Sequence, residues 1–310
     1  MDEIIVAKRK AAKLSIFSNS ALIVIKLVAG SLTGSVAIIS EATHSFLDLM
    51  AAMMAWGAVR VSDSPPDYEH PFGHGKTENI SALFEAILIV AGGIFILKEA
   101  IIGLINGRAL PDLKAGLGVM FLSTLTNYFI SRRLFKIGQK SGSQALTADA
   151  WHLRSDVYTS LGIFLALLVI EAGRFIDPSL DLNFVDSLAA ALVSVLIVKT
   201  GAVLGWDASK GLLDHSLPQA ELGIIVETIR ELYPQIRGFR RLRTRRSGPY
   251  RDILVDILVD GELSVATAHE LGVRFSLNLA AKLPKTNVTF HLEPLKHPRP
   301  EDEPGAKTCG

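Results

Sequence analysis

The sequence is short of charge and almost free of cysteine, and each shortage excludes a class of protein. Only 20% of the 310 residues are charged, against roughly 25% in soluble domains. The net charge is +1, so the chain as a whole is not built to bind nucleic acid. Its one cysteine, Cys309, cannot form an internal disulfide, so the fold needs no oxidising compartment. No P-loop and no nucleophile elbow occur, which argues against an ATP-driven machine and a hydrolase, and we expect no organic cofactor.

Long apolar stretches fill the chain up to about residue 206. A helix that crosses a membrane needs about 20 mostly apolar residues. Six stretches reach this length: 14–34, 36–60, 80–105, 112–131, 145–172 and 184–205. We therefore expect an α-helical membrane bundle of six transmembrane helices at 14–206, preceded by a cytoplasmic N-terminus at 1–13.

After residue 206 the pattern becomes that of a small soluble domain. "QAELGIIVETIRELYP" is typical of an amphipathic helix, and "YRDILVDILVDG" alternates polar and apolar residues like a strand. With a strand before it, and a helix and a strand after it, the order is α-β-β-α-β. We expect an open-faced α+β domain at 207–295 and a disordered tail, rich in proline and charge, at 296–310.

Lysine and arginine set the predicted orientation, because cytoplasmic loops carry the excess of positive charge. The N-terminus holds four basic residues between 8 and 13, and the loop "SRRLFKIGQKSGS" is also basic. Both should be cytoplasmic, and six spans then place the C-terminal domain on the same side. The sequence predicts a multi-pass protein of the lipid bilayer, in a bacterial inner (plasma) membrane with both termini cytoplasmic.

Two predicted spans carry a histidine and an aspartate four residues apart: His44 with Asp48, and His152 with Asp156. This spacing puts both side chains on one helix face. Counted from opposite membrane surfaces, both pairs fall near the bilayer midplane, where ionisable groups are functional candidates. Two imidazoles and two carboxylates suit tetrahedral Zn²⁺. The alternative to a metal site is that the two pairs form hydrogen bonds between helices. A third acid, Asp149, is expected to be either a charge at the cytoplasmic mouth of the bundle or a helix-end residue.

The segment between the second and third spans offers another set of ligands. In "SDSPPDYEHPFGHGKTENIS", Asp67, His70 and His74 have the spacing D-x-x-H-x-x-x-H. Prolines and glycines make this segment a loop, so its side chains can converge without helical register. The sequence predicts a second metal site here, with a merely polar loop as the alternative.

These motifs together resemble the cation diffusion facilitator family over residues 8–295. The resemblance rests on the paired HxxxD motifs, "HPFGHGKTE", "DAWHLRSD" and the C-terminal α+β domain, which is metallochaperone-like in the family. It implies a homodimer that exports divalent metal from the cytoplasm in exchange for protons. The implied transport site is His44, Asp48, His152 and Asp156, and the implied loop zinc site is Asp67, His70 and His74. A histidine at position 44 is the form associated with zinc, so Zn²⁺ is expected as cargo and as a structural or regulatory ion.

The resemblance is weaker in the C-terminal domain. Family members that bind zinc there use histidines and an acidic group at the dimer interface, and the matching positions here are Asp256, His269, His291 and Glu293. Arg240 stands where another histidine ligand is common, and an arginine cannot ligate a metal. One of the two metal positions is therefore lost or remodelled; alternatively, His269 and His291 are surface or interface residues.

The resemblance also implies an ion pair near the membrane, Lys76 with Asp214, which holds the dimer together. Two other functions stay open at this point. One is a facilitator of the same family for Fe²⁺, Co²⁺, Cd²⁺ or Mn²⁺, of which Mn²⁺ suits nitrogen ligands least. The other is a membrane-bound metal sensor or assembly scaffold with little flux.

Overall fold

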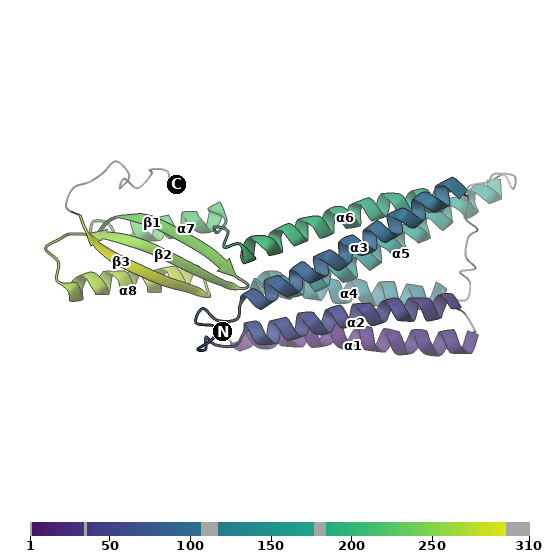
Figure 1. Ribbon diagram of the computed structural model, residues 1–310, viewed down its shortest axis with the longest axis horizontal. Coiled ribbons are helices and arrows are strands. Elements are labelled where there is room, and N and C mark those ends of the chain that lie inside the picture. The colour runs from purple at the N-terminus through teal and green to yellow at the C-terminus, as the bar shows by residue number, and fades with distance from the viewer. Residues whose placement is uncertain (1, 34–35, 107–116, 177–183, 296–310) are drawn as a thin grey trace. The chain divides into compact units, whose positions relative to one another are not determined.

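The computed structural model describes residues 2–33, 36–106, 117–176 and 184–295 (Figure 1). They fall into two compact units, Met1–Ser209 and Lys210–Gly310. The predicted tail at 296–310 lies outside the described residues, as do the first residues, 112–116, of the fourth predicted span.

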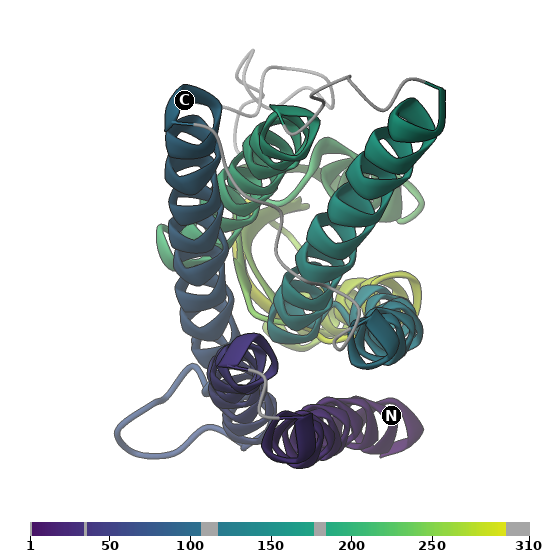
Figure 2. The ribbon, with the colours of Figure 1, turned by 90° about the vertical axis from the view of Figure 1, so that its right-hand side faces the viewer.

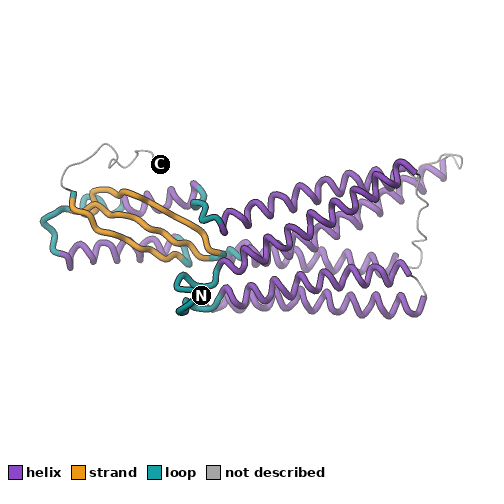
Figure 3. Tube along the Cα trace, viewed as in Figure 1, coloured by secondary structure: helices purple, strands orange, loops and turns teal. Residues whose placement is uncertain are grey.

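The first unit consists of long helices, drawn purple in Figure 3. In the described part of the chain they are α1 (Asp2–Thr33), α2 (Val36–Ser62), α3 (Lys76–Asn106), α4 (Leu117–Ser141), α5 (Gln144–Ile176) and α6 (Phe184–Leu212). Each corresponds to one of the six predicted spans, so the predicted helical bundle is confirmed. Several helices run past one end of their apolar stretch: α1 begins at Asp2, α4 ends at Ser141 and α6 ends at Leu212, because polar residues extend them past the bilayer core.

Four of the described segments are long and apolar enough to cross a membrane on length and composition alone: Glu3–Leu32, Lys76–Asn106, Gln144–Ile170 and Phe184–Leu212. Helix α4 is the most polar of the six, because it carries serine, threonine and asparagine, and α2 carries a histidine and an aspartate within its apolar stretch. Helix α2 packs on α1, α3 and α5, and α4 packs on α1 and α5. Figure 2 shows these helices end-on. Large apolar side chains such as Phe17, Phe95 and Phe121 are exposed, as expected of a surface that faces lipid.

Helices α3 and α6 meet at glycines. A Cβ atom on Gly201 of α6 would lie 2.9 Å from Cγ2 of Ile89 and 3.2 Å from the carbonyl oxygen of Ala86, both on α3. On α3, Gly93 has the same relation to α6, because its Cβ would lie 2.8 Å from Cγ2 of Val198. Small residues let membrane helices approach closely. The contact between α3 and α6 therefore has no room for larger side chains at these two positions.

The second unit is an α+β domain. After the end of α6 come α7 (Gln219–Arg230), β1 (Ile236–Ser247), β2 (Tyr250–Val259), α8 (Val265–Lys282) and β3 (Thr286–Pro294). The sheet order is β1-β2-β3, with β1 antiparallel and β3 parallel to β2. The parallel pair requires a crossover, which α8 supplies. The predicted order α-β-β-α-β is confirmed.

One face of this sheet packs on the two helices. On β2, Ile253, Val255 and Ile257 alternate along the strand and are buried against α7 and α8. On α8, Gly272 lies against the ring of Phe290 on β3, so closely that an added Cβ would come within 2.2 Å of a ring carbon. The opposite sheet face carries polar and charged side chains, which include those predicted to bind metal.

Candidate functional site

The two HxxxD motifs face each other across α2 and α5. Nε2 of His152 lies 3.0 Å from Oδ1 of Asp48, and Nε2 of His44 lies 3.8 Å from Oδ1 of Asp156 and 3.9 Å from Oδ1 of Asp48. Ligand atoms of His44, Asp48 and Asp156 all lie within 4.8 Å of one another. These three residues therefore come together, with His152 bonded to Asp48, and α2 packs directly on α5. We call His44, Asp48, His152 and Asp156 the helix cluster.

Burial differs across the helix cluster. The side chain of Asp48 is 6% exposed and that of His152 is 12% exposed, whereas that of His44 is 55% exposed. Oδ2 of Asp156 is buried and has no hydrogen-bond partner among the described residues. A buried carboxylate oxygen without a partner is costly. The helix cluster thus combines buried carboxylates with one exposed imidazole, that of His44.

The loop motif also folds into a cluster. Oδ1 of Asp67 lies 3.3 Å from Nδ1 of His70, and Oδ2 of Asp67 lies 3.3 Å from Nε2 of His74. The backbone N–H of His70 donates to Oδ1 of Asp67 at 2.6 Å, and this bond holds the pKa of the Asp67 carboxyl below its usual value. The turn depends on Gly73, whose φ of 79° favours glycine. We call Asp67, His70 and His74 the loop cluster.

The loop cluster has the donors of a zinc site. Its three ligand atoms lie within 4.8 Å of one another, and Nδ1 of His74 is buried without a hydrogen-bond partner in the described part of the chain. Thr77 anchors the following turn, because its hydroxyl donates to the carbonyl oxygens of His74 and Ala58. Two imidazoles and a carboxylate leave a fourth position for water or another ligand.

A third cluster lies on the exposed face of the C-terminal sheet. Asp256 pairs with His291 in the strand register, and ligand atoms of Asp256, His291 and Glu293 lie within 4.8 Å of one another. We call these three residues the sheet cluster. The predicted partner His269 is exposed on α8, with its ring 5.9 Å from that of Phe290, and is not among the three.

Two arginines donate hydrogen bonds to the carboxylates of the sheet cluster. Arg241 donates to Asp256 and, at 2.6 Å, to Oε1 of Glu293, and its hydrogen bond to Asp256 raises the pKa of the guanidinium. Arg240 donates to Oε2 of Glu293 at 3.4 Å. The strand pairing shifts register between Arg240 and Arg243, and Arg241 has a φ of 46°. Both carboxylates of the predicted metal site are therefore already neutralised by cations of the chain itself.

The predicted dimer pair falls in two separate units. Lys76 begins α3, and Asp214 follows α6 with a φ of 54°. Within its own unit, Oδ2 of Asp214 accepts a hydrogen bond from Nη1 of Arg245 at 3.2 Å. The pairing of Lys76 with Asp214 across a dimer stays a prediction.

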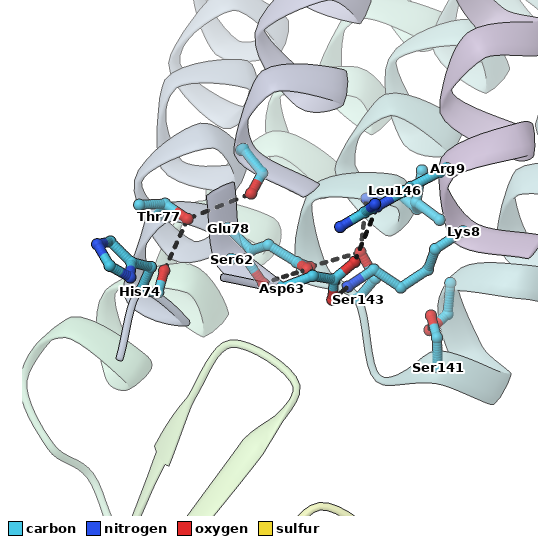
Figure 4. A network of polar contacts seen from close by, with 12 residues as sticks. Lys8, Arg9, Ser62, Asp63, His74, Thr77, Glu78, Ser141, Ser143 and Leu146 are labelled. Atoms are coloured by element: carbon cyan, nitrogen blue, oxygen red, sulfur yellow. Dashed lines mark hydrogen bonds and ion pairs between the residues drawn. The ribbon is translucent and has the colours of Figure 1, made fainter. Parts of the chain in front are cut away.

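A buried ion network at one end of the bundle was not predicted (Figure 4). Nζ of Lys8 donates to Asp63 at 2.8 Å and to Glu78 at 2.7 Å, and all three side chains are at most 1% exposed. Ser62 and Ser143 donate to the two oxygens of Glu78 at 2.9 and 2.5 Å. Removing one partner of such a buried pair costs about 3–5 kcal/mol. The network connects α1, α2, α3 and the turn before α5. The sequence does not reveal it, because its partners lie up to 70 residues apart and share no short motif.

The chain is similar to known proteins along most of its length. A family model described as the cation efflux transmembrane domain matches residues 12–213, and one described as the cation efflux protein cytoplasmic domain matches residues 217–295. The second match supports dimerisation, since the matched domain is a dimerising one. Together the two matches reach from the first helix to the last strand.

Two curated relatives span nearly the whole chain. An uncharacterized transporter of Synechocystis, sll1263, is 32% identical over 298 residues, which are 96% of this chain and 93% of the relative. The cation-efflux pump FieF of Salmonella agona is 30% identical over 275 residues, 89% of each chain. A solved structure, the metal-bound C-terminal domain of the CzcD transporter from Thermotoga maritima, is 33% identical and covers 26% of this chain and 98% of its own, with a TM-score of 0.24. The chain thus belongs to the cation diffusion facilitators, a family of membrane transporters, not enzymes, that carry divalent metal cations out of the cytoplasm.

Proposed function

We propose that this transporter exchanges cytoplasmic Zn²⁺ for protons through the helix cluster. The observation that carries the proposal is the convergence of His44, Asp48 and Asp156 within 4.8 Å, with His152 bonded to Asp48 at 3.0 Å. Two imidazole nitrogens and two carboxylate oxygens form a tetrahedral set that suits Zn²⁺. Harder ions such as Mn²⁺ favour oxygen ligands alone.

Proton exchange follows from the ligand types. Metal binds deprotonated imidazoles and carboxylates, so zinc binding releases protons and protonation releases zinc. Imidazoles change charge near neutral pH, which suits them to this competition. Zinc would bind from the cytoplasm, the helices would rock to expose the site on the other side, and protons would displace the ion there.

The test is exchange in proteoliposomes loaded with a zinc-sensitive dye and given a pH gradient. We expect His44→Ala and Asp156→Ala to abolish the zinc movement that the pH gradient drives. His215→Ala is the control, because His215 is exposed and lies outside the three clusters. Exchange at the normal rate by both helix-cluster variants would show that the ion takes another route.

The same vesicles test the other candidate functions. A transporter for Fe²⁺, Co²⁺, Cd²⁺ or Mn²⁺ would move that ion faster than Zn²⁺ when the ions compete at equal concentration. A sensor or scaffold would bind metal but show little flux. We regard transport as better supported, because a sensor needs no complete four-ligand set inside a membrane bundle.

The surrounding assembly belongs to the same proposal. We propose a homodimer in a bacterial inner membrane with both termini in the cytoplasm, held in register by Lys76 and Asp214. The loop cluster would hold a structural zinc ion. In the sheet cluster, Arg240 and Arg241 already neutralise the carboxylates of Asp256 and Glu293, so zinc there would have to displace them.

A further inference from the structure

Two buried acids in the bundle take no part in the helix cluster. Glu85 on α3 is 0% exposed and Asp149 on α5 is 1% exposed. Neither oxygen of the Glu85 carboxylate has a hydrogen-bond partner among the described residues. An isolated carboxylate in a membrane interior costs several kcal/mol. Glu85 also interrupts the most apolar of the candidate spans.

The two acids lie side by side. Helices α3 and α5 start at the same end of the bundle and rise together (Figure 1). At their first turns, Nδ2 of Asn79 donates to Oε1 of Gln144 at 2.7 Å, and one turn on, Ala82 and Ala148 pack in one apolar cluster. From the Asn79–Gln144 contact, Glu85 lies six residues along α3 and Asp149 five residues along α5. At 1.5 Å per residue these are about 9 and about 7.5 Å, so the two acids lie at nearly the same height. Their charges accordingly interact.

Hydroxyl groups complete an oxygen-rich surround. Ser15 of α1 lies against Asp149, and Ser81 precedes Glu85 by one helical turn on the same face of α3. Ser15 is 0% exposed and Ser81 is 2% exposed. Among the described residues, the Ser81 hydroxyl has no hydrogen-bond partner. Polar groups of α1, α3 and α5 thus gather here, and the Glu85 carboxylate and the Ser81 hydroxyl lack, in the described chain, the partners that buried polar groups normally have.

We propose that Glu85, Asp149, Ser15 and Ser81 form a second site for a divalent cation, which the ion occupies before it reaches the helix cluster. Asp149 lies three residues before His152, on the side of the helix cluster where α5 begins, so the path from the cytoplasm would pass this site. The proposal rests on the proposed function, because it takes the helix cluster as the transport site. We call it the oxygen site.

The ligand types fix the class of ion that the oxygen site prefers. Oxygen donors without nitrogen or sulfur favour hard cations such as Mn²⁺ and Mg²⁺, and they hold Zn²⁺ less tightly than a set with imidazoles does. Conduction needs sites that bind an ion well enough to admit it and weakly enough to release it. The oxygen site would collect Zn²⁺ and pass it on to the tighter helix cluster.

The first test counts Mn²⁺ ions on the full-length protein by the loss of the free Mn²⁺ spin-resonance signal. We expect the double variant Glu85→Gln/Asp149→Asn to bind one Mn²⁺ fewer per chain than the wild type. We expect His44→Ala/Asp156→Ala to keep that ion, and Glu99→Gln, which changes another acid of α3, to leave the count unchanged. Equal counts in the wild type and the Glu85→Gln/Asp149→Asn protein would overturn the oxygen site and show that these carboxyls hold only protons.

The second test measures zinc transport and separates binding from turnover. Because the charge of the ligands sets the affinity of an oxygen site, we expect Glu85→Gln/Asp149→Asn to raise KM for Zn²⁺ about tenfold and to change kcat about twofold at most. The milder pair Ser15→Ala/Ser81→Ala should raise KM less, and it guards against a folding defect in the first variant. An unchanged KM in both would overturn the oxygen site while the proposed function stands. Normal transport by His44→Ala/Asp156→Ala would instead overturn the proposed function.

Discussion

At the scale of single residues, Asp48 has two roles in the proposed transport site. It offers a carboxylate oxygen as a proposed ligand atom, and it holds Nε2 of His152 at 3.0 Å. We expect Asp48→Asn to lower zinc affinity by about 100-fold, since even the loss of a group that only orients a ligand costs about 10–100-fold. Calorimetric titration of the purified protein measures this, with Asp48→Glu as the variant that keeps the charge. Equal zinc affinities of the wild type and Asp48→Asn would show that Asp48 is not a zinc ligand.

Glu221 is a residue whose charge stabilises the second unit. It accepts hydrogen bonds from Arg251 at 2.8 and 2.9 Å and from Arg246 at 2.9 Å, and the bond from Arg251 holds its carboxyl pKa below the ordinary 4.5. A lowered pKa in the folded state means that this stabilisation is present above about pH 4.5 and disappears as the pH falls through the lowered value.

We expect Glu221→Gln to destabilise α7 by about 1–2 kcal/mol at neutral pH, the range for a hydrogen bond to a charged group with some solvent screening. Hydrogen exchange of peptides from 219–230 in the full-length protein measures this. The difference from the wild type should shrink as the pH drops below 4.5. Glu227→Gln, an exposed acid on the same helix, is the control, and an equal effect there would show that the ion pairs are not the cause.

At the scale of elements, two glycines within helices of the second unit should respond oppositely to the same substitution. A Cβ on Gly272 of α8 would come within 2.2 Å of the Phe290 ring, whereas a Cβ on Gly223 of α7 would meet nothing within 4 Å. We expect Gly272→Ala to destabilise the unit by about 1–3 kcal/mol through overpacking. Gly223→Ala should stabilise it by about 1 kcal/mol through helix propensity. Thermal unfolding followed by circular dichroism compares the two, and a shift of the same sign in both would contradict the packing of α8 on β3.

The backbone geometry of β1 determines which cations contact the carboxylates of the sheet cluster. A register shift in β1 and the left-handed backbone of Arg241 bring the guanidinium onto Asp256 and Glu293. We expect Arg241→Ala to free Asp256 and one oxygen of Glu293, while Arg240 keeps the other, and to raise the number of Zn²⁺ ions bound per chain by one. Equilibrium dialysis of the full-length protein measures the number. The control is Arg243→Ala, which changes an exposed arginine of the same strand and should leave the number of bound Zn²⁺ ions unchanged. If Arg241→Ala also left that number unchanged, the sheet cluster would not bind zinc.

At the scale of the whole molecule, exchange with protons makes zinc transport depend on the proton gradient. We expect zinc accumulation in inside-out vesicles to stop when a proton ionophore is added, and to continue without ATP, because the sequence has no P-loop. A zinc-sensitive dye inside the vesicles reports accumulation. Accumulation that continues at full rate with the ionophore would contradict exchange with protons.

The sequence predicted the features whose cause is local. Helical spans and alternating strands follow from periodicity. Short spacings, such as the four-residue step from His44 to Asp48, place candidate ligands on one helix face or in one loop. Contacts between distant residues were not predictable. Lys8 meets Glu78 across 70 residues, and Glu85 looked like one polar residue in an apolar span until Asp149 was placed beside it. The arginines of β1 have no spacing that reveals which carboxylates they reach.

Arg241 gives the C-terminal domain a cation that no chelator can remove. A domain whose carboxylates are bridged by a metal ion changes its charge balance whenever the ion leaves. Here the cation that balances Asp256 and Glu293 is a guanidinium of the chain itself. The domain would then keep one conformation across the whole range of cytoplasmic zinc, and the rate of export would follow only the filling of the sites inside the membrane.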